Sequence, residues 1–192
     1  MNQDDVLIQV AQHLARAGIP FMVTGSVVSS AYSQPRSTNE LDIVIDPTPA
    51  QLEHWLTLLG KNYYVSPEAA RDALRRRSMF NIIDLIGGWK ADLIVRKNRP
   101  FSVEEFQRRK TATLAGQPLP LACPEDVILA KLEWNRVTPS ERQVKDAFSV
   151  AVAQWPQLDQ AYLRKWAPTL GVSVELEEML QAAERAQCPP TP

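Results

Sequence analysis

Acidic side chains at two places in the chain have the type and spacing of a metal-binding site. Glu40 and Asp42 are separated by one residue at the start of an alternating apolar segment. Asp92 is the one charged residue of the otherwise apolar segment 91–95. Residues 41–45 alternate as a strand does, so Glu40 and Asp42 should share one face, where their charges repel unless a cation offsets them. Mg²⁺ prefers oxygen ligands and commonly takes one or two carboxylates with substrate phosphates. We therefore predict that Glu40, Asp42 and Asp92 bind a divalent cation, the alternative being a solvated strand face.

A glycine-serine turn is the second feature with a chemical use. Gly25 and Ser26 follow the apolar segment 21–23 and precede residues 27–32, which have helical spacing. Glycine lets the backbone approach a ligand closely, amides at a helix start attract anions, and the Ser26 hydroxyl adds a donor. The turn is thus expected to bind phosphate, unless glycine only serves the shape of the turn. Together with the acids it favours metal-assisted phosphoryl or nucleotidyl transfer.

Asp84 competes with Asp92 for the place of the third acid. Both lie on an expected hairpin over residues 79–95, which turns around Gly87-Gly88. A two-residue loop would pair Ile83 with Asp92 and place Asp84 on the opposite face, whereas a three-residue loop would place both acids on one face. We favour Asp92.

The elements that position these residues form a small mixed sheet flanked by helices, followed by a helical C-terminal part. Helices are expected over 4–17, 27–32, 50–60, 68–77, 101–110, 124–136, from 140, and over 173–186, with strands over 21–23, 41–45, 79–86 and 89–95 and an extended segment over 114–121. Ser140 and Gln143 have the spacing of a capping box. We assign residues 1–120 to an α/β core, 121–187 to the helical part and 188–192 to a loose tail.

The order of these motifs resembles that of the nucleotidyltransferase (polymerase-β-like) superfamily. Gly25-Ser26 is followed, after thirteen residues, by Glu40-Leu41-Asp42 and later by Asp92. The resemblance implies an α/β (α+β) nucleotidyltransferase fold, a nucleoside triphosphate substrate, and Mg²⁺, with Mn²⁺ as the alternative cation.

A closer resemblance is to the bacterial AbiEii-like branch, which includes toxin nucleotidyltransferases. The matching segments are residues 36–42, 125–132 and 142–146. This branch implies nucleotide contacts for Arg36, Thr38, Lys131 and Asp146, a catalytic role for Lys131 beside the phosphates, and an antitoxin-like protein partner. From the residues alone, Lys131 could instead be a lysine on a helix surface near Glu133.

One residue departs from the family pattern, because Glu40 stands where the first acid is usually Asp. The extra methylene moves the carboxylate, and Mg²⁺ tolerates little geometric slack. Two functions therefore remain open. One is an enzyme that moves a nucleoside monophosphate from a nucleoside triphosphate to a hydroxyl of RNA, protein or a small molecule. The other is a weakened or inactive protein of this fold that binds a nucleotide or a partner.

Charge and hydropathy limit the other classes of function. The 192 residues carry a net charge of -1, so any attraction to nucleic acid must be local. The basic clusters 71–77 and 96–110 could bind RNA or triphosphate, or could be solvated faces that balance nearby acids. No apolar run reaches the roughly 20 residues of a membrane span, and the acidic start lacks a signal-peptide pattern, so a cytoplasmic protein is expected.

Overall fold

The computed structural model describes residues 2–34 and 40–187 of the chain. It divides into two compact units. The sheet unit consists of Met1–Val27 and Ser37–Ala122, and the helical unit of Val28–Arg36 and Cys123–Pro192. Helix α2 (Gly25–Tyr32) begins in the sheet unit and ends in the helical unit. None of the helices in the described part is long and apolar enough to cross a membrane.

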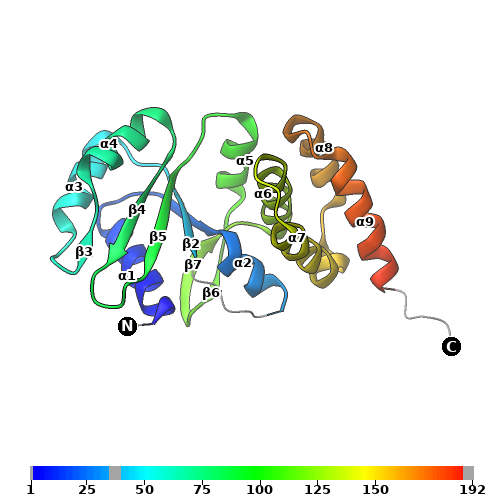
Figure 1. The fold of residues 1–192 in the computed structure, drawn as a ribbon, viewed down its shortest axis with the longest axis horizontal. Helices are drawn as coiled ribbons and strands as arrows, with labels where there is room; N and C mark the ends of the chain where they lie inside the picture. Colours follow the sequence, from blue (N-terminus) through cyan, green and yellow to red (C-terminus); the bar gives the residue numbers. More distant parts are fainter. Residues whose placement is uncertain (1, 35–39, 188–192) are drawn as a thin grey trace. The chain divides into compact units, whose positions relative to one another are not determined.

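The sheet unit is built on one mixed sheet. Its strands, over the described residues, follow the order β3-β4-β5-β2-β1-β7-β6 (Figure 1). Their bounds are β1 Phe21–Thr24, β2 Leu41–Ile45, β3 Tyr63–Tyr64, β4 Met79–Asp84, β5 Lys90–Val95, β6 Lys110–Leu114 and β7 Gln117–Leu121. The pairs β2–β5 and β1–β7 are parallel, and the other neighbours are antiparallel. The predicted α/β class with a small mixed sheet is therefore confirmed.

Alternating residues give this sheet one strongly apolar face. Leu41, Ile43 and Ile45 of β2 are each at most 1% exposed, and burial of such side chains contributes about 1.5–3 kcal/mol apiece. Helices α1 (Gln3–Arg16), α3 (Pro49–Leu58) and α4 (Pro67–Arg76) lie together beside β4 in Figure 1, and α5 (Pro100–Arg108) completes the unit. Trp55 of α3 packs edge to face on Phe80 of β4, with ring centroids 6.0 Å apart. The helix α3 thus covers the face that carries Phe80.

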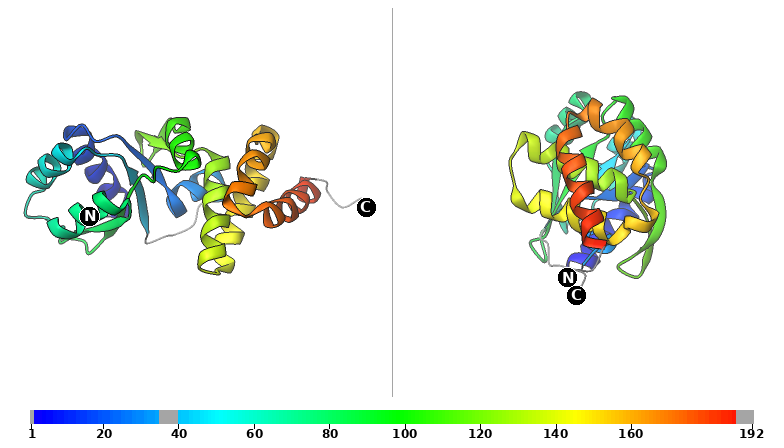
Figure 2. Two further views of the ribbon diagram at one scale, coloured as in Figure 1. Left: turned by 90° about the horizontal axis from the view of Figure 1, so that it is seen from above. Right: turned by 90° about the vertical axis from the view of Figure 1, so that its right-hand side faces the viewer.

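The helical unit contains α6 (Pro124–Val137), α7 (Glu141–Gln154), the short 3₁₀ helix η1 (Trp155–Gln157), α8 (Gln160–Leu170) and α9 (Ser173–Gln187). Pro124 begins α6 at a position where its missing N–H costs nothing, and Gly171 ends α8 with a φ of 70°. Helices α6 and α7 pack on each other, α8 packs on α6, and α9 packs on α6, α7 and α8 (Figure 2). The predicted helical character of this region agrees with these elements.

Four elements differ from the prediction. Helix α8, the 3₁₀ helix η1 and strand β3 were not predicted, and residue 110 begins β6 instead of ending a helix. Strands β6 and β7 form a hairpin whose turn residues, Ala115 and Gly116, have φ values of 50° and 72°. Two consecutive left-handed residues match the right-handed twist of the strands, which explains why the chain reverses so tightly there.

Candidate functional site

Four polar residues lie in register across four neighbouring strands of the sheet unit. Asn81 of β4 pairs with Asp92 of β5, Asp92 with Asp42 of β2, and Asp42 with Thr24 of β1. Side chains at paired positions point to the same face, and adjacent strands are about 4.8 Å apart. These residues therefore form one continuous row, which we call the polar row. The sheet thus brings the predicted acids Asp42 and Asp92 together.

Two nitrogen donors hold one oxygen of Asp92. The Asn81 amide Nδ2 donates a hydrogen bond of 2.6 Å to Asp92 Oδ1, and the Lys90 ammonium lies 3.0 Å from the same atom. The side chain of Asp92 is 22% exposed, and that of Lys90 is 52% exposed. Sequence reasoning did not identify Asn81 or Lys90, because their closeness to Asp92 depends on the register of the hairpin.

That register differs from both predicted alternatives. Ile83 pairs with Lys90, so the loop is longer than the two or three residues expected around Gly87-Gly88. The carboxylate of Asp84 accepts hydrogen bonds from the amides of Ile86 and Gly87, at 3.2 and 2.7 Å, and these bonds shape the loop. Asp84 is 1% exposed and lies on the face opposite Asp92. It belongs to the loop and not to the polar row.

Gly25 has a structural role that concerns Asp42 directly. It begins α2 with a φ of 70°, which L-residues rarely adopt. A Cβ atom at this position would lie 2.8 Å from Cγ and 2.9 Å from Cβ of Asp42, and closer still to Oδ2. Glycine is therefore needed here so that the Asp42 carboxylate can reach the start of α2, where the helix dipole favours negative charge. The neighbouring Ser26 is 3% exposed, and its contact with phosphate stays a prediction.

The other predicted residues of this site are either exposed or outside the described part of the chain. Glu40 precedes β2 and is exposed. Arg36 and Thr38 lie outside the described residues, as does the predicted tail. Within residues 2–34 and 40–187, no three His, Cys, Asp or Glu side chains are grouped as a metal site. The two carboxylates of the polar row nevertheless fit Mg²⁺, which commonly takes one or two carboxylates and completes its shell with water and substrate phosphates.

The helical unit joins the other two predicted residues in a buried ion pair. Lys131 Nζ lies 3.0 Å from Asp146 Oδ2, and their side chains are only 5% and 9% exposed. The alternative of a surface lysine is therefore wrong. The predicted capping box is also wrong: Ser140 precedes α7 as its N-cap residue but makes no side-chain capping hydrogen bond, and Gln143 Oε1 accepts from Lys131 at 3.0 Å. Burial of a charged pair needs such added hydrogen bonds to offset desolvation.

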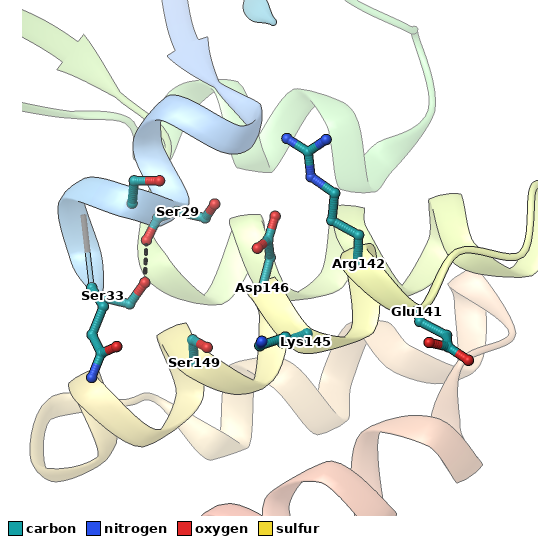
Figure 3. A pocket seen from close by; sticks show the side chains of 9 residues that line it. Ser29, Ser33, Glu141, Arg142, Lys145, Asp146 and Ser149 are labelled. Atoms are coloured by element: carbon teal, nitrogen blue, oxygen red, sulfur yellow. Dashed lines mark hydrogen bonds between the residues drawn. The ribbon is translucent and has the colours of Figure 1, made fainter. Parts of the chain in front are cut away.

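A polar pocket of about 400 Å³ lies beside this pair within the helical unit (Figure 3). Its lining residues are Ser29, Ser30, Ser33, Gln34, Glu141, Arg142, Lys145, Asp146 and Ser149. In Figure 3, Asp146 and Arg142 extend from α7 toward α2, and Glu141 is directed away. The hydroxyl of Ser30 is buried and has no hydrogen-bond partner in the part of the chain that the structure describes. Such a group indicates a place for a polar ligand or water.

The basic cluster 71–77 is balanced by acids of the sheet unit. Arg71 makes a bidentate contact with Glu53, at 2.7 and 2.8 Å. Arg75, Arg76 and Arg77 also pair with acids, namely Asp72 and Asp46. Asp46 binds Arg96 as well, at 2.9 Å. These pairs favour charge balance over nucleic-acid binding for this cluster.

Comparison with known proteins supports the fold. No protein-family model and no curated protein matches the sequence. An antigenic nucleotidyltransferase-like protein from Paracoccidioides brasiliensis is 18% identical, with a TM-score of 0.57, over 93% of this chain and 92% of that one. The antibiotic-resistance factor ANT(2'')-Ia is 12% identical over 96% of both chains, with a TM-score of 0.56.

A second structure of ANT(2'')-Ia, in complex with adenylyl-2''-tobramycin, is 13% identical, with a TM-score of 0.54, over 98% of this chain and 100% of that one. These likenesses show the fold alone, and membership of the nucleotidyltransferase superfamily and of its AbiEii-like branch stays a prediction. The chain therefore has the fold of solved nucleotidyltransferases.

Proposed function

We propose that this protein is a metal-dependent nucleotidyltransferase. The observation that carries the proposal is the in-register pairing of Asp42 and Asp92 beside Gly25 at the beginning of α2. A shared fold alone does not define an activity, so the proposal depends on the chemistry of these side chains. Two carboxylates held on adjacent strands next to a helix start suit a cation together with a triphosphate.

In the proposed reaction, an acceptor hydroxyl oxygen forms a bond to the α-phosphorus of a nucleoside triphosphate. The bond from that phosphorus to the α–β bridging oxygen breaks, and pyrophosphate leaves with the electron pair. The hydroxyl proton passes to a base, for which Asp92 is our candidate because one of its oxygens receives no donor from the described residues.

Glu40 and Asp42 would hold Mg²⁺ or Mn²⁺, and Asp92 would be the third ligand or, in place of that role, the base. When bound, the cation neutralises charge on the triphosphate and polarises the phosphoryl oxygens. The amides of Gly25 and Ser26 are proposed to donate to phosphate oxygens at the beginning of α2. Arg36 and Thr38, between α2 and β2, are proposed further contacts of the nucleotide.

The helical unit is proposed to contribute to nucleotide binding through Lys131 and Asp146. Lys131 and Asp146 neutralise each other. Arg142 and Lys145, which line the pocket, therefore give its wall a positive charge. This charge suits an anionic group of a substrate. Replacing Lys145 with Met should weaken nucleotide binding in calorimetry, whereas Lys165→Met, at an exposed lysine of α8, should not.

A labelled-nucleotide assay tests the proposed activity. Each α-labelled nucleoside triphosphate is incubated with Mg²⁺ and with RNA, protein or small-molecule acceptors. Because ANT(2'')-Ia is seen with adenylyl-2''-tobramycin, hydroxyl-bearing small molecules are tested first. Asp42→Ala should lower transfer by about 100-fold or more, whereas Asp72→Ala on α4 should not. Wild-type activity in Asp42→Ala would refute the assignment.

The second candidate, a binding protein without turnover, is favoured by Glu40 alone. Calorimetric titration with Mg²⁺ and each triphosphate distinguishes the two, since a binding module gives heat but no product. Glu40→Asp should raise turnover if the longer side chain limits the enzyme. A toxin role with an antitoxin-like partner is a further proposal, and co-expression with the product of a neighbouring reading frame would test it.

A further inference from the structure

We propose that Asn81 is a positioning residue for Asp92. Its amide fixes Oδ1, so that Oδ2 is the oxygen that Asp92 offers to a cation or to a proton. The inference rests on the proposed function, because it concerns the same carboxylate. It adds a residue that neither the sequence motifs nor the predicted ligand set contains.

The contacts of Asp92 carry this proposal. Asn81 Nδ2 and Lys90 Nζ both approach Oδ1, at 2.6 and 3.0 Å. Among the described residues, none donates a hydrogen bond to Oδ2. The two oxygens of this carboxylate therefore have different surroundings, because the donors among the described residues contact Oδ1 alone. The terminal torsion of aspartate is otherwise broad, so a hydrogen bond to one oxygen restricts where the other lies.

Asn81 and Lys90 differ in how firmly they can hold this oxygen. Asn81 has a short side chain and is fixed opposite Asp92 by the β4–β5 register. Lys90 has a long flexible side chain that is 52% exposed, and exposed ion pairs of this kind contribute only about 0–1 kcal/mol. We therefore assign the orientation of Asp92 to Asn81, while Lys90 contributes mainly its positive charge.

This division gives the two donors opposite effects on cation binding. Residues that orient a metal-ligating carboxylate typically change metal affinity or activity by 10–100-fold when they are removed. Loss of the Asn81 amide should therefore weaken binding. Loss of the Lys90 charge should leave it equal or make it tighter, because an ammonium beside the carboxylate repels an incoming cation.

Mn²⁺ titration followed by electron paramagnetic resonance, without nucleotide, tests this inference independently of turnover. Asn81→Leu keeps the approximate size of the side chain and removes its donor, and we expect a dissociation constant raised by roughly 10-fold. Lys90→Met should bind Mn²⁺ at least as tightly as the wild type. Met79→Ala is the matched control, because Met79 is an exposed residue of the same strand and face.

A turnover measurement adds a second readout. Asn81→Leu should lower kcat at limiting Mn²⁺, and saturating Mn²⁺ should restore part of the loss, which a general structural defect would not allow. Urea unfolding of Asn81→Leu and Asn81→Ala checks stability, which should change little at this exposed position.

The outcomes separate this inference from the proposed function. If Asp42→Ala and Asp92→Ala lose Mn²⁺ binding while Asn81→Leu binds as the wild type does, only the role of Asn81 is overturned. A wild-type protein without a Mn²⁺ site, or one whose affinity is unchanged by Asp42→Ala, overturns both.

Discussion

Replacement of Gly25 by alanine is the sharpest perturbation of the candidate site. The change adds a single methyl group at a position with two independent requirements for glycine. The φ of 70° disfavours any residue with a Cβ, by about 1–2 kcal/mol. The added Cβ would also lie 2.8 Å from Cγ of Asp42, well inside carbon–carbon contact distance.

The expected magnitude is the sum of these two costs. Overpacking of a well-packed site typically destabilises by about 1–3 kcal/mol, so Gly25→Ala should lower the free energy of unfolding by about 2–5 kcal/mol in total. To restore ordinary contact distance, the Asp42 carboxylate must move by about 1 Å. A displacement of this size can cost about 100-fold in rate, which we expect for nucleotide transfer.

Gly88→Ala is the matched control. Gly88 has a φ of 72°, and a Cβ added there would meet nothing within 4 Å. The same substitution therefore introduces the backbone strain without the clash, and the effect of alanine on the unfolded chain is common to both variants. Urea denaturation should show a difference of about 1–3 kcal/mol between them, and Gly88→Ala should retain full transfer activity.

Equal stability and equal activity of the two variants would refute this reasoning. A double-mutant cycle adds a second check. Asp42→Ala removes Cγ and Oδ2 but keeps Cβ, so it should relieve much of the clash in Gly25→Ala. Strictly additive effects of the two substitutions on stability would show that the methyl group does not act through the carboxylate.

Three further predictions concern stability and ionisation. Lys131→Met leaves Asp146 buried without its cation and should cost about 3–5 kcal/mol in urea denaturation, whereas Lys131→Met with Asp146→Leu should recover most of it; an equal loss in the double variant would contradict the pairing. Ala115→Gly relieves a residue with a φ of 50° and should stabilise by about 0.5–1 kcal/mol in the same assay; no gain would contradict the strain. Burial, followed by nearby Cys123 and two acids, raises the pKa of Tyr32 to about 12, so the ultraviolet titration of Tyr32→Phe should lack a late-titrating phenol that the wild type shows. Because this pKa exceeds the ordinary 10.0, its contribution to stability is present below pH 10 and is lost as pH rises toward 12.

Local periodicity was enough to predict the strands that carry the acids. Alternation at 41–45 and 91–95 is a property of neighbouring residues, so the faces of Asp42 and Asp92 could be inferred from sequence. Their adjacency depends on the parallel pairing of β2 with β5. Only the order of the motifs indicated that the two acids would lie together. The neighbour of Asp92 on β4 could not be inferred, because Asp84 binds the loop amides and shifts the pairing by two residues, from Ile83 to Asn81.

The helical unit shows where local signals mislead. Ser140 and Gln143 have capping-box spacing, but the Gln143 side chain instead accepts a hydrogen bond from Lys131. Sequence spacing does not predict this contact. Helix α8 was missed because Pro168 lies inside it and a proline removes one backbone hydrogen bond. Its buried Leu163 and Trp166 supply packing that offsets this cost, and their helical spacing was the signal that could have revealed the helix.

Helix α2 has a consequence for the way the protein is made. From Val28 onward it belongs with a segment that begins only at Cys123, and its Tyr32 carbonyl accepts a hydrogen bond of 2.8 Å from Gln154. At ribosomal rates of about 5–20 residues per second, this part of α2 waits on the order of ten seconds for its partners. So short a helix is marginal alone. The helical unit is therefore not a module that can be cut out or transplanted as one contiguous segment, and a nascent chain that stops before Cys123 keeps the second half of α2 unsupported.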